Sequence, residues 1–154
     1  MKANVGLLQQ RCIEAKVFTA FLKALEKEIG KERARSLVAS VVRDLAFEKG
    51  RELRVQCPNG DITALADLWQ SLREGGALDV EFVEQTDTCL HLHVARCGYA
   101  EAYQEMGLAD LGCLLSCDRD EPLLRGFSDE ITLERSRPIM EGGDCCDILY
   151  RVKK

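Results

Sequence analysis

Apolar residues recur every three or four positions through the first half of the chain, which is the period of an amphipathic helix. One such segment covers residues 5–29 and stops at Gly30. A second covers about 31–47, with Gly50 beyond its expected end as a helix terminator. Together they predict an antiparallel helix pair. The stripe of the first segment consists of Ile13, Val17, Phe21, Leu25 and Ile29, with Phe18 and Leu22 beside them.

A third amphipathic segment follows a break in this pattern. Residues 51–60 contain a proline and an Asn-Gly pair, which are typical of a turn. Apolar residues then return at helical spacing over 62–72, and a Gly-Gly pair closes the segment. Either Asn59 or Asp61 is expected to cap the first turn of this helix.

The apolar period changes to strict alternation after residue 76, as in β-strands. Residues 78–83 and 88–95 predict a β-hairpin. The remaining expected elements are short helices at 99–106 and 108–117, an acidic loop at 118–129, and strands at about 130–136 and 145–152. This order predicts an α+β fold: N-terminal helices plus a small antiparallel sheet of about four strands, which helices cover on one face. The other face is left for solvent, a partner or a ligand.

Length and charge narrow the class of protein. The 154 residues predict a single domain, 1–154, with a helical part at 1–76 and a sheet-containing part at 77–154. The formal charge of −5 provides no basic face for nucleic acid. No apolar run reaches the roughly 18 residues of a membrane span, and the N-terminus lacks the apolar block of a signal peptide. We therefore expect a soluble, cytoplasmic protein without nucleic-acid or membrane partners, whose helix pair covers the sheet or forms a homodimer.

The eight cysteines are unusual for a chain without an export signal, where disulfides are rare. Cys12, Cys57 and Cys89 are expected to pack as small apolar side chains. Three others come from separate elements and, with His93, match by type the ligand set of a tetrahedral zinc site. They are Cys97, Cys117 and Cys146. The chain has no Cys-x-x-Cys pair, so core packing is the alternative for these thiols as well.

The second predicted strand carries two histidines on one face. Because side chains alternate along a strand, its apolar residues share the core side. His91 and His93 share the other side, together with Cys97 if the strand is still extended there. A His-x-His pair on one face can bind a metal, and nearby thiols would suit zinc. The alternative is that both histidines are exposed to solvent without a ligand.

Two segments in the second half carry charges that need an explanation. Cys117 ends a predicted helix, and Asp118 and Asp120 follow at once. A helix C-terminus with acidic neighbours raises a thiol pKa, which argues against a reactive thiolate. The carboxylates would bind an amidine-like cation, act as a general base, or form a solvated acidic loop. Arg135 lies on an otherwise apolar strand face, where it would clamp a substrate carboxylate or form an ion pair.

Standard catalytic motifs are absent: the sequence has no phosphate-binding glycine loop, no Gly-x-Ser-x-Gly and no His-Glu-x-x-His. An ordered set of shorter motifs occurs instead over residues 80–152. It consists of Arg96-Cys97-Gly98-Tyr99-Ala100-Glu101, Glu105-Met106-Gly107, Cys117-Asp118-Arg119-Asp120, Phe127, Leu133-Glu134-Arg135 and Met140-Glu141-Gly142-Gly143-Asp144-Cys145-Cys146-Asp147. In this set the chain resembles the L-2-amino-thiazoline-4-carboxylic acid hydrolase-like family.

The resemblance implies hydrolytic opening of a cyclic isothiourea, 2-amino-thiazoline-4-carboxylate, to a carbamoyl-cysteine. In such a site Asp120 or Asp118 would hold the amidinium and steer water. Cys117 or Cys146 would attack the ring carbon or lie beside it, and Arg135 would bind the carboxylate. The full set of candidates is Cys97, Cys117, Asp120 and Cys146 for catalysis, and His93, Asp118, Arg135 and Asp147 for substrate binding.

The expected sheet, with helices before each hairpin, is also similar to 4-vinyl-reductase-like sensory domains. Those domains bind small molecules and can carry a cysteine-rich zinc site. This chain departs from their cysteine cluster near the C-terminal hairpin, where it has only Cys145 and Cys146. The alternative function is therefore a sensor-like module that binds a small molecule or zinc without catalysis.

Overall fold

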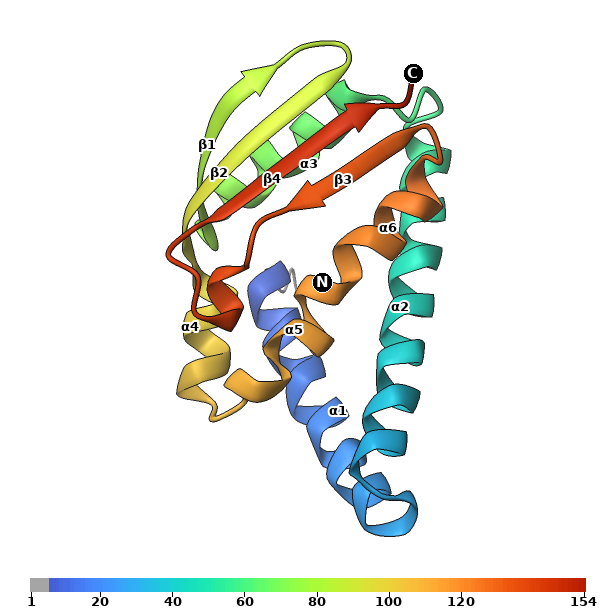
Figure 1. Ribbon diagram of the computed structural model, residues 1–154, viewed down its shortest axis with the longest axis vertical. Helices are drawn as coiled ribbons and strands as arrows, with labels where there is room; N and C mark the ends of the chain where they lie inside the picture. The colour runs from blue at the N-terminus through green and yellow to red at the C-terminus, as the bar shows by residue number, and fades with distance from the viewer. Residues whose placement is uncertain (1–5) are drawn as a thin grey trace, which may run out of the picture.

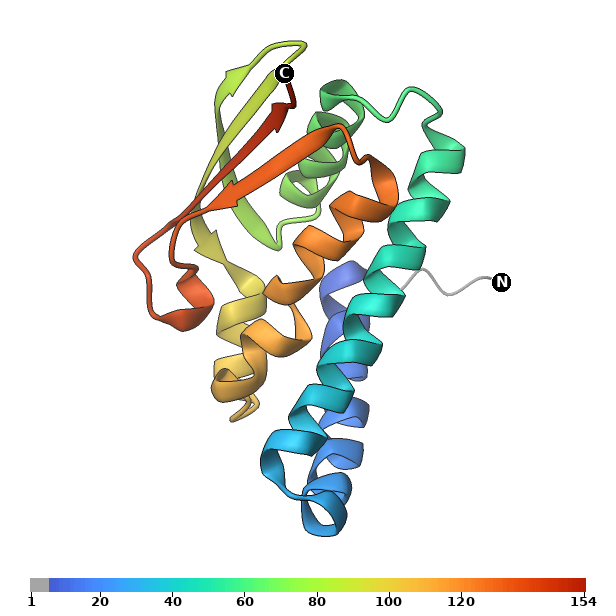
Figure 2. The same ribbon diagram turned by 45° about the vertical axis from the view of Figure 1, so that its right-hand side comes forward.

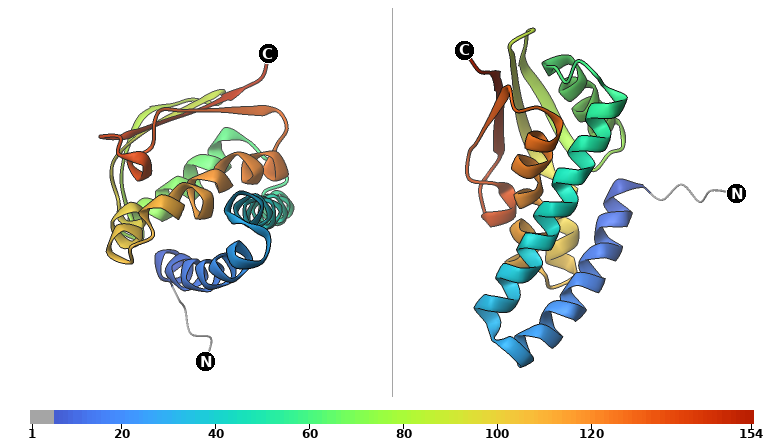
Figure 3. Two further views of the ribbon diagram at one scale, coloured as in Figure 1. Left: turned by 60° about the horizontal axis from the view of Figure 1, so that its bottom comes forward. Right: turned by 90° about the vertical axis from the view of Figure 1, so that its right-hand side faces the viewer.

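The computed structural model describes residues 6–154 and confirms the expected α+β fold. A four-stranded antiparallel sheet has the spatial order β1-β2-β4-β3 (Figure 1). Seen from one end, the helices lie on one side of this sheet (Figure 3, left). The strands are β1 (Leu78–Gln85), β2 (Cys89–Cys97), β3 (Ile131–Arg135) and β4 (Cys146–Val152).

The helices form a long hairpin and a set of shorter pieces packed against it. α1 (Leu7–Ile29) and α2 (Lys31–Gln56) turn around Gly30, and they diverge away from this turn (Figure 3, right). Residue 5, where the first helix was expected to begin, lies outside the described residues. The shorter elements are α3 (Ile62–Glu74), α4 (Gly98–Glu105), α5 (Gly112–Leu115), α6 (Asp120–Phe127) and the 3-10 turns η1 (Ala109–Leu111), η2 (Cys117–Arg119) and η3 (Ile139–Glu141).

The predicted end of the second helix near residue 47 is wrong, because α2 continues to Gln56 through Gly50. Residues 51–56, expected in a turn, are therefore helical. A Cβ atom built on Gly50 would lie 2.0 Å from the carbonyl oxygen of Leu123 in α6. Gly126 of α6 is equally close to α2, since its Cβ would lie 2.1 Å from the carbonyl oxygen of Phe47. Both glycines thus permit backbone contact between two helices (Figure 2).

The prediction of an acidic loop at 118–129 is also wrong, because most of this segment forms α6. Asp120 and Glu121 lie in the first turn, where carboxylates favour the positive end of the helix dipole. Pro122 is tolerated there because the first backbone amides of a helix have no partner within it. Leu124 and Phe127 are buried against the sheet-side core. Amphipathic burial therefore outweighs the loop-like composition.

Other predictions are confirmed. The Asp61 carboxylate caps α3 by accepting a hydrogen bond from the backbone amide of Ala64 at 3.0 Å. The hairpin of β1 and β2 and the pair of β3 and β4 form as expected. The inner face of the sheet packs on α3 and α6, where the indole of Trp69 donates to the Tyr150 hydroxyl at 3.2 Å.

A β-bulge near the end of β2 changes which way its side chains face. Asp79 pairs with Arg96 and Val80 pairs with Val94, so Ala95 is an extra residue on β2. Beyond the bulge, Cys97 turns to the inner face of the sheet with Val94. The expectation that Cys97 shares a face with His93 is therefore wrong, because the strand does not keep its alternation there.

Candidate functional site

A cavity of about 250 Å³ lies between the inner face of the sheet and the helical layer. Its wall combines residues from all four strands with residues from α1, α2, α3 and α6. Five of the eight predicted site residues line it: Cys97, Cys117, Asp120, Arg135 and Cys146. The fold thus brings together residues spread over much of the second half of the sequence.

Two of the three cysteines of the cavity accept hydrogen bonds from backbone amides. The Cys97 thiol accepts a hydrogen bond from the amide of Ala100 at 3.4 Å and so caps α4. The buried Cys146 sulfur accepts from the amide of Ile139 at 3.2 Å. Cys117 begins the turn η2, just before the helix that carries Asp120. The two hydrogen bonds fix the Cys97 and Cys146 thiols as part of the wall.

Asp120 and Arg135 form the central charged pair of the cavity. Arg135 Nη1 lies 2.6 Å from Asp120 Oδ2 and also donates to the carbonyl oxygen of Cys117 at 3.0 Å. Of the two partners expected for Arg135, the structure shows the ion pair. Within residues 6–154 no hydrogen bond reaches Asp120 Oδ1, which leaves this oxygen available to a ligand.

Burial raises the pKa of the carboxyl and thiol groups that line the cavity. Burial raises the pKa of Asp120 to about 6, against the opposing effect of the Arg135 charge. Burial also raises the pKa of the Cys97 and Cys146 thiols. It raises the pKa of Cys117 most strongly, with further contributions from Cys113 and Asp120. The raised pKa expected for Cys117 is confirmed, although burial and not the helix end is its main cause. All three thiols are therefore protonated at neutral pH.

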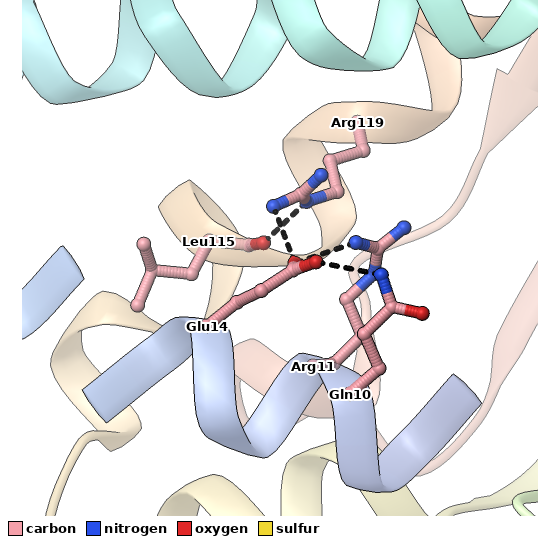
Figure 4. A network of polar contacts seen from close by, with 5 residues as sticks. All are labelled: Gln10, Arg11, Glu14, Leu115 and Arg119. Atoms are coloured by element: carbon pink, nitrogen blue, oxygen red, sulfur yellow. Dashed lines mark hydrogen bonds and ion pairs between the residues drawn. The ribbon is translucent and has the colours of Figure 1, made fainter. Parts of the chain in front are cut away.

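Three cations that sequence analysis did not single out also line the cavity: Arg11, Lys49 and Arg119. Arg119 is buried; its Nε donates to the carbonyl oxygen of Leu115 at 2.7 Å, and its Nη2 lies 3.3 Å from Glu14 (Figure 4). Arg11 contacts the same Glu14 oxygen at 2.6 Å. In an isolated helix pattern such residues resemble solvent-exposed charges. Arg11 and Arg119 are brought to the cavity where α1 and η2 meet at Glu14, and Lys49 is brought there by α2.

Cations outnumber carboxylates in the cavity wall, although neighbouring carboxylates offset part of their charge. Four cations and one carboxylate line the wall, while Glu14 pairs with both Arg11 and Arg119, and Glu52 pairs with Lys49. The rest of the wall is largely apolar or aromatic, with Leu65, Trp69 and Tyr150 among its residues. Such a site can bind a small ligand that carries a carboxylate.

The other three predicted site residues lie outside this cavity. Asp118 lines a more open cleft next to it, 4.0 Å from Arg43 Nη2. His93 and Asp147 lie on the outer face of the sheet, with His93 Nδ1 at 3.1 Å from Asp147 Oδ1. The sheet thus separates His93 from the cysteines of the cavity. The interpretation of His93 and those three cysteines as the ligands of one zinc site is therefore wrong.

Comparison with known proteins identifies the family. A sequence profile described as L-2-amino-thiazoline-4-carboxylic acid hydrolase matches residues 10–150. The chain belongs to this family. The match of the L-2-amino-thiazoline-4-carboxylic acid hydrolase profile includes every residue of the cavity wall except Leu7. No curated protein matches the chain.

Two solved structures are similar in fold to this member of the L-2-amino-thiazoline-4-carboxylic acid hydrolase family. One is the phenol-responsive sensory domain of the transcription activator PoxR with phenol, 14% identical, with a TM-score of 0.51 and coverage of 86% of this chain and 71% of that chain. The other is trafficking protein particle complex subunit 3 from Naegleria fowleri covalently bound to palmitic acid, 9% identical, with a TM-score of 0.53 and coverage of 94% and 96%. At these identities the likeness concerns the fold alone.

Proposed function

We propose that the chain hydrolyses a cyclic isothiourea that carries a carboxylate, such as L-2-amino-thiazoline-4-carboxylate, to a carbamoyl-cysteine. The observation that carries this proposal is the Asp120–Arg135 pair inside a cation-lined cavity. A volume of about 250 Å³ is below the roughly 300–1,000 Å³ of pockets for drug-sized ligands, which suits a small heterocycle. Family membership supports the same class of reaction.

Binding would use the two kinds of charge in the wall. The substrate carboxylate would meet the remaining N–H groups of Arg135. Arg11 and Arg119 line the same cavity and share Glu14 as their counter-charge. The amidine-like nitrogens would face the free oxygen of Asp120. This orientation places the carbon between the nitrogens and the sulfur near Asp120 and the cavity thiols.

Water is the nucleophile that this site favours. Asp120 has a pKa of about 6, so at neutral pH it is mostly ionised and able to accept a proton from water. The cavity thiols are protonated, and a thiol is a much weaker nucleophile than a thiolate. Water adds its oxygen to the C=N carbon while Asp120 takes one of its protons, and the ring nitrogen that receives the electrons of the C=N bond picks up this proton from Asp120. One ring bond from that carbon, to sulfur or to nitrogen, then breaks as the added hydroxyl becomes a carbonyl, and the hydroxyl proton goes to the leaving atom. The sum is addition of one water.

Mass spectrometry of L-2-amino-thiazoline-4-carboxylate incubated with the purified protein tests this proposal. We expect a product one water heavier with the wild type, and strongly reduced product with Asp120→Asn. Cys146→Ala tests whether the cavity thiol contributes. Cys89→Ala is the matched control, because Cys89 lies outside the cavity wall. Absence of turnover by the folded wild type would overturn the hydrolase assignment for this substrate.

A ligand-binding module without catalysis is the second candidate, and the apolar wall around Trp69 favours it. Such a module would bind a small carboxylate-bearing heterocycle and release it unchanged. Calorimetric binding without a mass change would support this candidate, whereas turnover would exclude it.

We also infer that a second copy of the chain covers the helical hairpin. In the described residues, all but one of the exposed large apolar side chains lie on α1 and α2. The helices have 23 and 26 residues, so each is about 35–39 Å long. A face of this length can supply the roughly 800 Å² per partner of a stable interface. The stripe predicted from the sequence supplies several of its members, namely Ile13, Val17, Phe21 and Ile29.

A further inference from the structure

The outer face of the sheet carries a cluster of metal-binding side chains that the cavity does not use. His93 of β2 and Asp147 of β4 are paired across neighbouring strands, and Cys145 immediately precedes β4. One donor atom from each of these three residues lies within 4.8 Å of the other two. His91 points to the same group, since its Nε2 lies 3.6 Å from Asp147 Oδ1.

We propose that His91, His93, Cys145 and Asp147 form a zinc site on the outer face of the sheet, separate from the cavity. Two imidazoles, a thiolate and a carboxylate are ligands that zinc accepts in a four-coordinate site. This mixture of nitrogen, sulfur and oxygen ligands favours zinc over magnesium and calcium, which prefer oxygen ligands alone.

The distances from Asp147 to the other three donor atoms are close to those of tetrahedral coordination. From usual zinc–ligand bond lengths, neighbouring ligand atoms lie about 3.3–3.6 Å apart. Asp147 Oδ1 lies 3.1 Å from His93 Nδ1 and 3.6 Å from His91 Nε2, and Asp147 Oδ2 lies 3.9 Å from Cys145 Sγ. Shifts of a few tenths of an ångström in half-buried side chains would therefore accommodate the ion.

The surroundings of the cluster also favour a cation. Glu81 of β1 pairs with His93, and Glu84 pairs with His91, so both carboxylates border the histidines on the same face. The backbone of Asp147 is fixed, because its amide donates to the Ser136 hydroxyl at 2.8 Å. A partly preorganised ligand loses less conformational freedom when the metal binds.

Zinc on the outer face of the sheet would restrain the part of β4 that carries Cys146 on the inner face. Cys146 lies between two of the ligands, Cys145 and Asp147, but its side chain points inward to the cavity. The metal would hold the backbone on both sides of Cys146. We therefore assign the ion a positioning role and no part in the reaction.

Zinc affinity of the chelator-treated full chain, measured by competition with a chromogenic chelator, tests the site. We expect one zinc per chain in the wild type. His93→Gln, Cys145→Ser and Asp147→Asn should each weaken binding by more than about tenfold. Cys117→Ser and Cys146→Ser are the matched controls and should leave the affinity unchanged, because these thiols lie on the other side of the sheet. Circular dichroism checks that each variant is folded.

Cobalt(II) provides a second measurement that reports on the thiolate directly. The cobalt-loaded wild type should show a sulfur-to-metal charge-transfer band in the near ultraviolet, and Cys145→Ser should lack it. Failure of the wild type to bind zinc would overturn the proposal. The proposal would also be overturned if His93→Gln and Cys145→Ser bound zinc as tightly as the wild type, or if Cys117→Ser lost the metal. Since the readout is metal binding, the result does not depend on whether the chain is a hydrolase.

Discussion

The reactivity of the cavity depends on how two residues balance burial against charge. Asp120 loses hydration, which disfavours its ionised form, while Arg135 at 2.6 Å stabilises that form. The result is a carboxylic acid whose pKa lies close to neutral pH, as a general base requires. Burial likewise raises the pKa of the Cys117 and Cys146 thiols, and it outweighs the opposing effect of the Arg135 charge. Their neutral form therefore dominates.

The pH dependence of turnover should follow Asp120. Because its pKa is raised to about 6, kcat should be constant above this pH and fall by about tenfold per pH unit below it. Steady-state rates over a pH series check this limb. A rate that rises as pH falls through 6 would contradict a base role for Asp120.

Stability should respond to the same group in the opposite sense. A carboxyl group with a raised pKa in the folded state binds its proton more tightly there than in the unfolded chain. Its contribution to the free energy of unfolding therefore grows as pH falls through about 6. Urea unfolding on either side of this pH measures the effect, and Asp120→Asn should remove this component.

Arg135→Leu should raise KM for the carboxylate substrate by more than about tenfold, since a charge-assisted contact of about 1.5–3 kcal/mol is lost. Arg135→Lys should recover part of this loss by keeping the charge. Folding is affected less, because Asp120 can take up a proton once its cation is gone. Wild-type KM in Arg135→Leu, measured beside its melting temperature, would remove Arg135 from the binding site.

At the scale of elements, the contact between α2 and α6 positions the cavity. The two helices touch through their backbones at Gly50 and Gly126, and α6 begins with Asp120. The apolar period predicted α1, α3 and the four strands, because their faces are either buried or exposed along most of their length. It did not predict the end of α2 or the existence of α6. The sequence alone does not distinguish a glycine that ends a helix from one that lets a neighbouring backbone approach. Only the position of the neighbouring helix does so.

Gly50→Ala should lower the melting temperature, because the added Cβ would lie 2.0 Å from the Leu123 carbonyl oxygen. Overpacking of this kind costs about 1–3 kcal/mol, which is several degrees for a chain of this size. Gly75→Ala is the control, since its Cβ would meet atoms no closer than 3.4 Å. Equal melting curves for both variants would mean that α2 and α6 do not touch as described.

At the scale of the whole molecule, the cavity is a property of the assembled fold. The resemblance of short motifs was sufficient to nominate Cys97, Cys117, Asp120, Arg135 and Cys146, which the fold then brings to one cavity. Arg11, Lys49 and Arg119 could not be nominated in this way, because nothing in a helical pattern tells an inward cation from an outward one. His93 and Asp147 show the reverse error, because both were nominated for substrate binding but lie on the outer face of the sheet, away from the cavity.

The exposed apolar surface of the helical hairpin predicts a dimer that a single charge should disrupt. Phe21 is 65% exposed on α1, and Phe21→Glu should convert the dimer to a monomer because the charge would be buried in the interface. Light scattering coupled to size exclusion measures the mass. Val83→Glu, at a position 52% exposed on β1, should stay dimeric. A monomeric wild type would leave this surface without its proposed partner.

The bulge at Ala95 makes strand length a criterion for comparing sequences. With the extra residue, one strand sends His93 to the outer face and Cys97 to the inner face, four positions later. In a regular strand with the same four-residue spacing, the sulfur would instead share the outer face with His93, because side chains alternate. A strand one residue shorter and without the bulge would again turn the sulfur inward. In other family members, an even spacing between this histidine and this cysteine therefore requires a bulge to build the same cavity wall, whereas an odd spacing requires a regular strand.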